Sequence, residues 1–479
     1  MRIQRFAVVL LGITLALLLL TTMGGIPAMA QDPNTSATLT SIVFEDTFDT
    51  FTFAYRGTNY YGSRGNPLTH KEYAWGSGSA GSLLKQQVLT YLHDSDSNYL
   101  AKNIVKRVNN AQTQDAGGTK IAEVIVTYDS TTLTSVTGVT HHDTTNFGTG
   151  YTLRGNPTVT QNWESGSTYL STTFSYDITG QVRTRTDPNG NATNFSYTDA
   201  YYSDNGSNPP ATYSPTPPTT NAHLTLTTRA SGNTLSYGYY YGSGKPAVSK
   251  EENNQTTYTH FQDVLNRPTK KYTPGGFWVQ NEFTTATHTK HTAPGSFLDE
   301  HDTSGLGQPT AGILSSDPSG TTRSDTTYDT SGRVQSVTNP YRGSPSGSNS
   351  MLYDGLNRVT KLTLADGNYQ EAFFGSNVGT GGGITSQLCS TATYGVGYPQ
   401  LYKDEAGKKR QQWLDALGRL IEADEPDATG ALSLGTCHKY DLLGNLKEVN
   451  QGTQTRTNVY DGMGRLTART SPEGGTEYL

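Results

Sequence analysis

The sequence predicts an all-β protein in which repeated antiparallel hairpins lie side by side in one long sheet. Three observations lead to this fold class. The chain of 479 residues contains 30 tyrosines and 52 glycines but only 16% charged residues, a composition typical of strands and tight turns. The motif Tyr-Asp-x-x-Gly-Arg-Leu recurs along the chain. Turn clusters such as "TDPNGN" and "SDPSGT" separate the strand-like segments.

The first 30 residues have the features of a secretory signal peptide. Two arginines precede an apolar run at residues 6–20, and Ala28 and Ala30 supply the small residues of a cleavage site. An uncleaved membrane anchor is the alternative, but the apolar run is short for a membrane span. We therefore expect cleavage after Ala30 and a secreted or cell-surface protein.

Charge and cysteine content narrow the function classes. The formal net charge is −6, and loss of the two leader arginines leaves 33 basic and 41 acidic residues. This mild excess gives no indication of nucleic-acid binding or of a cationic membrane surface. The two cysteines, Cys389 and Cys437, would meet oxidising surroundings after export. We expect a disulfide across adjacent repeats, with two unpaired thiols as the alternative.

The recurring motif has the chemistry of a hairpin turn. Alternating residues before the aspartate, as in "TTFSYD", form a strand. The aspartate carboxylate can accept backbone N–H groups in an Asx turn, and three residues later the chain needs a positive φ, which glycine adopts without steric cost. Asparagine, the next most tolerant residue, replaces glycine in two copies. The predicted turn residues are Tyr176, Asp177, Gly180, Asp263, Asn266, Tyr328, Asp329, Gly332, Tyr353, Asp354, Asn357, Asp415, Gly418, Tyr440, Asp441, Gly444, Tyr460, Asp461 and Gly464.

One hairpin cannot bury its apolar face alone, so neighbouring units must stack into a continuous sheet. We predict a β-rich N-terminal region at residues 31–171 and a repeat region at residues 172–479. Residues 205–220 are rich in proline and cannot pair as a central strand. They are interpreted as a surface loop between repeats, and a linker between two independent domains is the alternative.

These motif copies and the Asp-Pro-x-Gly turns resemble those of the bacterial YD-repeat or RHS-repeat family, clearly from Thr172 to the C-terminus. The resemblance implies a curved sheet that spirals into a hollow shell with a tyrosine-rich inner wall. In that family such shells commonly enclose a C-terminal toxin domain, and teneurin-like relatives act in adhesion at the cell surface. The family's terminal core segment and a cargo-like change in composition are not found, so the chain is expected to correspond to an N-terminal part.

The sequence offers few candidate catalytic or metal-binding residues. The densest group of metal-ligating types is His288-x-x-His291 followed by residues 299–302, "DEHD". Residues three apart in a strand point to opposite faces, so the two histidines would diverge. We therefore interpret the segment as a solvated loop. Each repeat offers mainly one carboxylate, too few oxygen donors for a calcium array. No nucleophile motif or phosphate loop is found, so the sequence predicts no metal, no cofactor and no enzymatic activity.

The leading functional hypothesis is a non-enzymatic, exported structural module, part of a YD-repeat β-shell that encapsulates or displays a toxin or another partner. The expected partners are the remainder of a shell or a cargo domain. The alternative is a cell-surface protein for carbohydrate binding or adhesion. A hydrolase of polysaccharides on a β scaffold is a third hypothesis. Because an incomplete shell exposes strand edges, we also expect the mature chain to associate with other chains.

Overall fold

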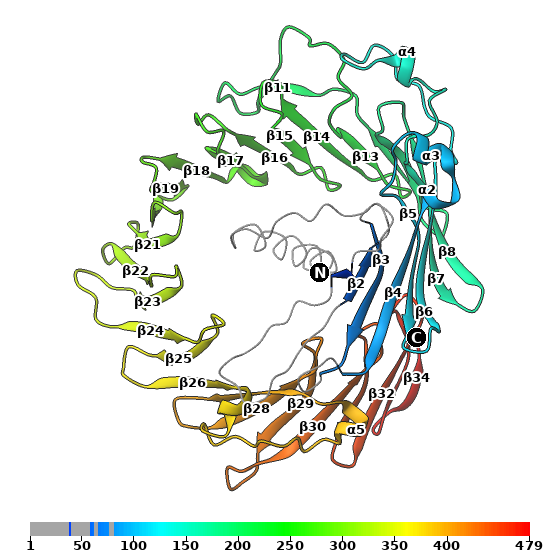
Figure 1. Ribbon diagram of the computed structural model, residues 1–479. Coiled ribbons are helices and arrows are strands. Elements are labelled where there is room, and N and C mark those ends of the chain that lie inside the picture. Colours follow the sequence, from blue (N-terminus) through cyan, green and yellow to red (C-terminus); the bar gives the residue numbers. More distant parts are fainter. Residues whose placement is uncertain (1–37, 40–57, 62–65, 76–80) are drawn as a thin grey trace.

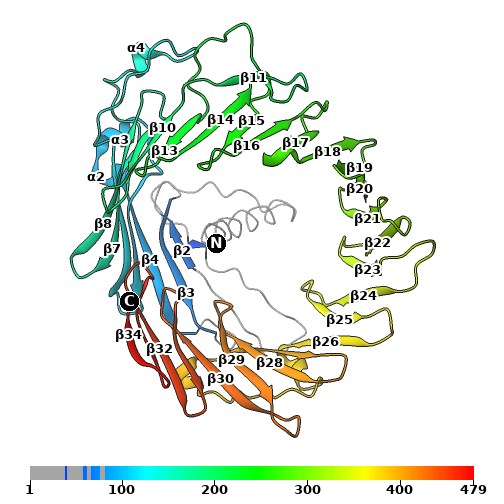
Figure 2. The same ribbon diagram turned by 180° about the vertical axis from the view of Figure 1, so that it is seen from behind.

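A computed structural model describes residues 38–39, 58–61, 66–75 and 81–479 of the chain, so the predicted signal peptide lies outside the described residues. Its strands form one sheet of 34 strands, which confirms the all-β fold class of repeated hairpins in a curved sheet. Figures 1 and 2 show this sheet bent into a ring. No helix in the described ranges is long and apolar enough to span a membrane.

The first part of the sheet contains the nine-residue strands β4, β6, β7 and β8. Its members are β1 (Thr38–Leu39), β2 (Thr58–Tyr61), β3 (Pro67–Tyr73), β4 (Leu83–Tyr91), β5 (Val108–Asp115), β6 (Lys120–Tyr128), β7 (Pro157–Ser165), β8 (Thr168–Tyr176), β9 (Val182–Thr186) and β10 (Ala192–Ser196). Three short helices lie in its connections: α2 (Leu92–Ser95), α3 (Ser97–Ala101) and α4 (Thr144–Phe147). The segment "SLLKQQVLTYLHD" at residues 82–94 forms β4 and the start of α2.

The middle of the sheet is built from shorter strands. They are β11 (Tyr201–Ser203), β12 (Ala211–Thr212), β13 (Leu226–Thr228), β14 (Thr234–Tyr240), β15 (Pro246–Lys250), β16 (Thr256–His260), β17 (Lys270–Tyr272), β18 (Trp278–Phe283), β19 (His288–Ala293), β20 (Phe297–Thr303), β21 (Pro309–Leu314) and β22 (Thr322–Tyr328). The 3-10 turn η1 (Pro274–Gly276) joins β17 to β18.

The last part completes the ring. It contains β23 (Val334–Thr338), β24 (Ser348–Tyr353), β25 (Val359–Thr363), β26 (Tyr369–Phe374), β27 (Tyr398–Lys403), β28 (Lys409–Leu414), β29 (Leu420–Pro426), β30 (Leu432–Tyr440), β31 (Leu446–Gln451), β32 (Gln454–Tyr460), β33 (Leu466–Ser471) and β34 (Gly475–Tyr478). The connection between β26 and β27 carries η2 (Gly375–Val378) and α5 (Thr391–Tyr394).

Almost every strand pairs antiparallel with the strand that follows it in sequence. The exception surrounds residues 197–225, because β10 pairs directly with β13. Within this excursion β11 pairs with β12 and runs parallel to β14. The proline-rich residues 205–220 therefore lie in an insertion beside the sheet, and the strand ladder continues without them.

A β-bulge recurs at the same position of the repeats. The register shifts just before the tyrosine that precedes the turn aspartate, as at Ser175/Tyr176, Thr327/Tyr328 and Leu352/Tyr353. The hairpins β30–β31 and β32–β33 share this shift. A bulge bends its strand and increases the local twist. Because the bulges repeat in phase, their bends accumulate into the curvature of the ring.

The β32–β33 hairpin, near the C-terminal end of the sheet, meets the β7–β8 hairpin at a contact that we name the seam. It joins Trp163 and Glu164 of the β7–β8 hairpin to Gly462 and Arg465 of the β32–β33 hairpin. The Gly462 N–H donates a hydrogen bond to the Glu164 carbonyl at 2.8 Å, and the Arg465 guanidinium forms an ion pair with the Glu164 carboxylate. The views in Figures 1 and 2 place the C-terminus beside the early strands. The ribbon thus returns to its own beginning.

The hydrophobic core is divided into small local clusters. One comprises Leu133, Tyr176 and Ile178, and another comprises Val378, Leu401 and Leu432. A single sheet has no second layer against which to bury one complete face. Contacts between neighbouring hairpins must therefore supply much of the stability.

Glycine at position 462 is required by the close packing of the seam. A Cβ there would lie 2.5 Å from Trp163 Cε3 and 2.7 Å from the Glu164 carbonyl oxygen. We predict that Gly462→Leu opens the seam, lowers the thermal unfolding midpoint and enlarges the particle in small-angle X-ray scattering. Gly305→Leu is the matched control, because Gly305 occupies the same turn position and an added Cβ meets no atom within 4 Å. Identical scattering from both variants would contradict the seam.

Candidate functional site

The repeat turns are held by the aspartate carboxylate. In the copy beginning at Asp329, Oδ1 accepts the backbone N–H groups of Ser331 and Arg333, each at 2.9 Å. Oδ2 accepts the Arg333 Nε–H at 2.7 Å. Gly332 has a φ of 76°, the left-handed conformation that the turn requires. Both carboxylate oxygens are therefore occupied by the turn itself, which leaves no free donor set for calcium.

The other predicted turns share this geometry. The carboxylates of Asp177, Asp263, Asp354, Asp415, Asp441 and Asp461 each accept the N–H of the residue two positions later. The residue three positions after each of the seven aspartates has a positive φ: Gly180 88°, Asn266 53°, Gly332 76°, Asn357 63°, Gly418 73°, Gly444 88° and Gly464 74°. Asparagine thus stands in glycine's conformation at both substituted positions.

The tyrosine of the motif binds the preceding hairpin. The Tyr353 hydroxyl donates to the Val334 carbonyl at 2.7 Å, and Val334 is the first residue of the previous return strand. The same bond joins Tyr176 to Pro157, Tyr328 to Pro309 and Tyr460 to Leu446. This role of tyrosine was not recognised in the sequence, although Tyr353 and Tyr328 both lie 19 residues after their acceptors.

The N-terminal region uses the same contact. The Tyr91 hydroxyl donates to the Pro67 carbonyl at 2.8 Å, and the Tyr128 hydroxyl donates to the Val108 carbonyl at 2.7 Å. Pro67 and Pro157 both follow the sequence Arg-Gly-Asn. This repeated "RGNP" was the sequence signal that could have extended the repeat pattern towards the N-terminus.

The arginine of the motif binds the following hairpin. Arg333 Nη1 donates to the Asp354 carbonyl at 3.3 Å and to Asn357 Oδ1 at 3.0 Å. Its guanidinium carbon also lies 4.7 Å from the centre of the Tyr353 ring, a favourable cation–π geometry. Arg419 repeats both contacts with the carbonyl of Asp441 and the ring of Tyr440. The copy from Tyr328 to Arg333 therefore contacts the hairpins on both sides.

These donors lower the pKa of several turn carboxylates. The bond from the Arg267 guanidinium lowers the pKa of Asp263 to about 2. At Asp354 and Asp461 burial opposes ionisation, but the backbone and guanidinium donors outweigh it and lower the pKa of both groups. A carboxylate that accepts several hydrogen bonds is favoured in its charged form. The carboxylates of Asp263, Asp354 and Asp461 consequently stay charged at neutral and mildly acidic pH.

A second group of polar side chains is fully buried between the sheet and the β26–β27 connection. This buried polar cluster consists of Gln411, Glu422 and Asp424, each 0% exposed. The Glu422 carboxylate accepts the Leu388 backbone N–H at 2.6 Å, and Trp413 Nε1–H donates to Asp424 Oδ2 at 2.7 Å. The connection thus covers the three side chains from solvent.

The disulfide holds the β26–β27 connection in place over the buried polar cluster. Cys389, in the β26–β27 connection, is joined to Cys437 on β30, with the two Cα atoms 5.8 Å apart. Cys437 is the register partner of Glu422. The disulfide therefore anchors the connection directly beside the buried polar cluster.

Burial raises the pKa of Asp424 to about 8, and the neighbouring Glu422 carboxyl contributes to the shift. Two carboxyl groups that share one site cannot both ionise easily. Such pairs serve as acid and base in some enzymes, but a substrate cannot reach groups that are fully enclosed. We assign this pair a structural role.

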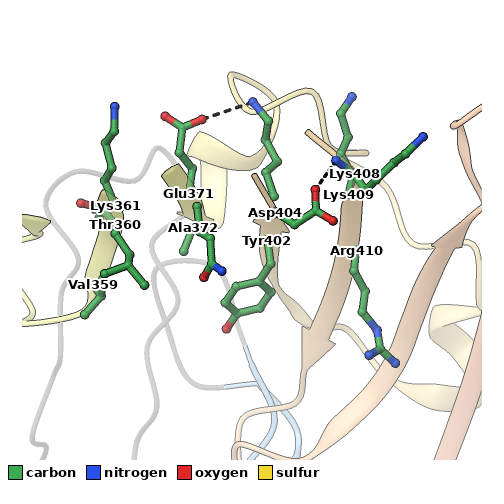
Figure 3. Close-up of a pocket in the computed structure, with 13 residues that line it drawn as sticks. Val359, Thr360, Lys361, Glu371, Ala372, Tyr402, Asp404, Lys408, Lys409 and Arg410 are labelled. Carbon is green, nitrogen blue, oxygen red and sulfur yellow. Dashed lines mark hydrogen bonds and ion pairs between the residues drawn. The ribbon is translucent and has the colours of Figure 1, made fainter. Parts of the chain in front are cut away.

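An open groove of about 440 Å³ crosses β25 to β28. Figure 3 shows Lys361, Glu371, Tyr402 and Arg410 along it. Lys361 pairs in register with Glu371, and Glu371 pairs with Lys403; the Lys403 ammonium lies 3.3 Å from the Glu371 carboxylate. The groove has more basic than acidic side chains, and the exposed ring of Tyr402 adds an aromatic surface.

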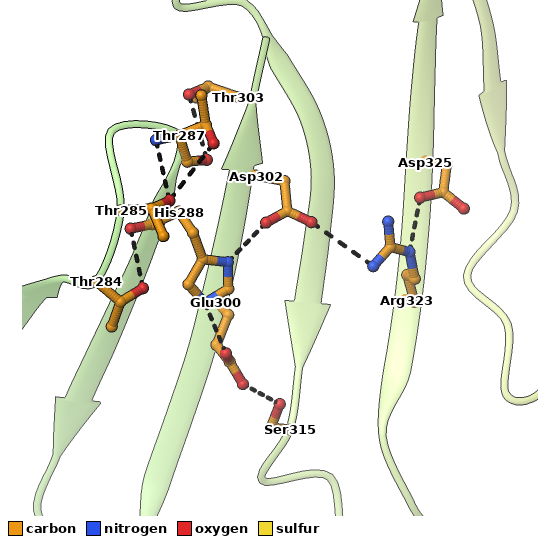
Figure 4. Close-up of polar contacts among 10 residues, drawn as sticks. All are labelled: Thr284, Thr285, Thr287, His288, Glu300, Asp302, Thr303, Ser315, Arg323 and Asp325. Atoms are coloured by element: carbon orange, nitrogen blue, oxygen red, sulfur yellow. Dashed lines mark hydrogen bonds and ion pairs between the residues drawn. The ribbon is translucent and has the colours of Figure 1, made fainter. Parts of the chain in front are cut away.

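The prediction that the histidine-containing segment is a solvated loop is wrong in one respect. Residues 288–293 and 297–303 form the paired strands β19 and β20. The expected divergence of His288 and His291 does occur. Figure 4 shows His288 between Asp302 and Glu300, with Nδ1 at 2.6 Å and Nε2 at 3.0 Å from their carboxylates. The bond with Asp302 raises the pKa of His288, so this face is a satisfied ionic network. His291 lies on the opposite face.

Comparison with known proteins gives one family match and several structural ones. The family model described as RHS Repeat matches residues 440–476. No curated protein matches the chain. The crystal structure of TcdB2-TccC3 is similar at 11% identity and a TM-score of 0.39, covering 88% of this chain and 30% of that one.

Two further solved structures are similar at low identity. The crystal structure of TcdB2-TccC3-Cdc42 has a TM-score of 0.32 at 11% identity, with coverages of 90% and 25%. The structure of the Photorhabdus luminescens Tc holotoxin pore has a TM-score of 0.28 at 10% identity, with coverages of 88% and 27%. This chain therefore spans less than a third of the length of each of the three.

Removing one inter-hairpin hydroxyl tests the tyrosine contact. We predict that Tyr353→Phe lowers the free energy of unfolding by about 1 kcal/mol, because the Val334 carbonyl loses its donor. Urea unfolding followed by tyrosine and tryptophan fluorescence measures the change. Tyr369→Phe is the control, since the Tyr369 hydroxyl makes no hydrogen bond with any described residue. An equal effect at both positions would show that the hydroxyl bond of Tyr353 has no special role.

The buried carboxyl pair predicts a pH dependence. Because the folded pKa of Asp424 is about 8 and the ordinary pKa of an aspartate is 3.8, the favourable contribution of Asp424 is complete below pH about 4 and is lost as the pH rises through about 8. The loss is at most about 1.4 kcal/mol per pH unit. Asp424→Asn stays neutral and can keep the Trp413 bond, so we predict a higher unfolding midpoint than wild type at pH 8 and a similar one at pH 4.

Glu425→Gln is the control for this experiment, because Glu425 is on the same strand but partly exposed. It should keep the wild-type decline between pH 4 and 8. A thermal midpoint of the wild type that stays constant over this range would refute the assignment of Asp424.

Proposed function

Because this chain belongs to the RHS-repeat, or YD-repeat, family, we propose that it forms the wall of an exported β-shell that encloses or displays a partner. In this proposal residues 172–479 are the repeat region and residues 31–171 are the N-terminal region of the same wall. The partner is the remainder of a shell, or a cargo such as a toxin domain.

The observation that carries this proposal is the closure of the sheet. The bulged hairpins curve through a ring, and the seam joins residues that are 301 positions apart. A second contact across the ring links Trp75 Nε1–H to the Leu414 carbonyl at 3.2 Å. A ribbon that returns to its beginning can surround a partner, which a flat repeat array cannot do.

The assignment to an exported compartment is supported by two features. The N-terminal 30 residues have the charge, apolar run and small residues of a secretory signal peptide. The disulfide Cys389–Cys437 fits an oxidising environment. Both support a secreted or cell-surface location.

A structural rather than catalytic role is supported by how the acidic groups are used. The repeat aspartates are saturated by their own turns, and the Glu422–Asp424 pair is enclosed. The recurring side chains of the motif thus serve to join hairpins. No cofactor is needed for this role.

Protease protection tests enclosure. The chain is co-expressed with the polypeptide encoded next to it, the complex is purified, and both partners are exposed to a broad-specificity protease. We predict that the partner is digested when free and protected in the complex, and that Gly462→Leu removes the protection while Gly305→Leu retains it. A partner digested equally fast in the wild-type complex and alone would refute enclosure.

A surface-binding role in adhesion is the second candidate, favoured by the groove across β25–β28. Its exposed Tyr402 ring and basic rim could contact an acidic glycan. A glycan array with the mature chain tests this role. Binding that depends on Tyr402 and Lys361 would support it, and the lack of binding to any glycan would reject it.

A further inference from the structure

We propose that His291, Asp299 and His301 form a binding site for one divalent transition-metal ion of the zinc type. None of these residues belongs to the repeat motif or to the groove. The site lies on the face of β19 and β20 opposite the network of His288.

Strand register brings the three side chains together. His291 on β19 is the direct partner of Asp299 on β20. Asp299 and His301 are two residues apart on β20, so their side chains lie on the same face. One strand therefore supplies two donors and its neighbour supplies the third, and the rigid ladder fixes their spacing.

The donor atoms are close enough to share one ion. One potential ligand atom from each residue lies within 4.8 Å of the other two. His301 Nε2 is 3.0 Å from Asp299 Oδ2, and His291 Nδ1 is 3.4 Å from Asp299 Oδ1. Metal–donor bonds of about 2.0–2.2 Å place donors roughly 3.3 Å apart in a tetrahedral zinc site. Small side-chain rotations bring the present arrangement to that geometry.

One oxygen of the Asp299 carboxylate has no hydrogen-bond donor. Asp299 Oδ1 is inaccessible to solvent and accepts no hydrogen bond from any described residue. A buried acceptor left without a partner is costly. Neither imidazole has a hydrogen-bond or ion-pair partner other than Asp299 within the described part of the chain, so each can direct a lone pair to an ion. A bound cation would satisfy the carboxylate and both rings together.

The donor set selects the class of metal. Two imidazole nitrogens and one carboxylate oxygen suit zinc and other late first-row ions, whereas calcium and magnesium prefer oxygen donors alone. Three protein donors leave a further coordination position for water or an incoming ligand. Gly312, the register partner of His301, has no side chain to crowd His301, since even an added Cβ would remain 4.0 Å from Nδ1.

The opposite face of the same strands provides a contrast. His288 uses both ring nitrogens on the carboxylates of Asp302 and Glu300, and those acids also contact Arg323 and Ser315 (Figure 4). That network already contains its cation and needs no metal. His288 is therefore a matched control: the same residue type, on the same strand, facing the other way.

Titration with a spectroscopic metal tests the site. The full exported chain is produced without a histidine tag, stripped with a chelator and titrated with Co²⁺ under visible absorption, followed by displacement with Zn²⁺. We expect one equivalent of Co²⁺ with the bands of a low-coordinate nitrogen–oxygen site, and its displacement by Zn²⁺. Excess Mg²⁺ or Ca²⁺ should leave the spectrum unchanged; displacement by either would overturn the assignment to a transition metal.

Variants locate the ion. His301→Ala and Asp299→Asn should each lower the affinity at least about tenfold and change the spectrum, whereas His288→Gln should bind as wild type. Circular dichroism verifies that every variant keeps its strands, so that lost binding is not lost folding. Wild-type affinity in His301→Ala, or an equal loss in His288→Gln, would overturn the proposal, as would the absence of stoichiometric binding to the wild-type chain.

Discussion

The contact between one hairpin and the next is the constraint on which this structure depends. A single curved sheet has no opposing layer, and its apolar clusters are small and local. In the repeat motif three side chains supply the stabilising contacts that an opposing layer would otherwise provide, and each contacts a different hairpin. Asp329 closes its own turn and Arg333 contacts the following hairpin, while a tyrosine such as Tyr353 binds the hairpin before it. The motif therefore joins neighbouring hairpins, which explains why it recurs in a chain built from hairpins.

Curvature and closure follow from the same units. The bulges before the motif tyrosines bend their strands, and the curvature of the sheet brings the β32–β33 turn to the β7–β8 turn. Here Gly462 is needed for close approach rather than for a positive φ, since Trp163 packs where a side chain would lie. A curved wall of this kind is consistent with the proposed role of holding or presenting another polypeptide.

Polar groups with roles other than turn formation occur where the chain departs from the repeat. The β26–β27 connection buries a carboxyl pair and is fastened by the disulfide, so it stiffens one sector of the ring. The β19–β20 hairpin lacks the motif and instead places charged and imidazole side chains on both faces. One face balances its own charge, and the other leaves a carboxylate oxygen unsatisfied. This difference between two faces of one strand pair is the basis for proposing a metal ion on only one of them.

The sequence alone determined the fold class and the turns, because the interactions of Asp, Gly and Asn in a turn extend over about four residues. The substitution of Asn357 for glycine was interpretable for the same reason. Only the tertiary structure decided which carbonyl each tyrosine reaches, where the ribbon meets itself, and that residues 288–293 and 297–303 are strands rather than a loop. It alone paired His291 with Asp299 and enclosed Asp424. These contacts depend on register, bulges and accumulated curvature, which arise from many weak, distant interactions that no short segment specifies.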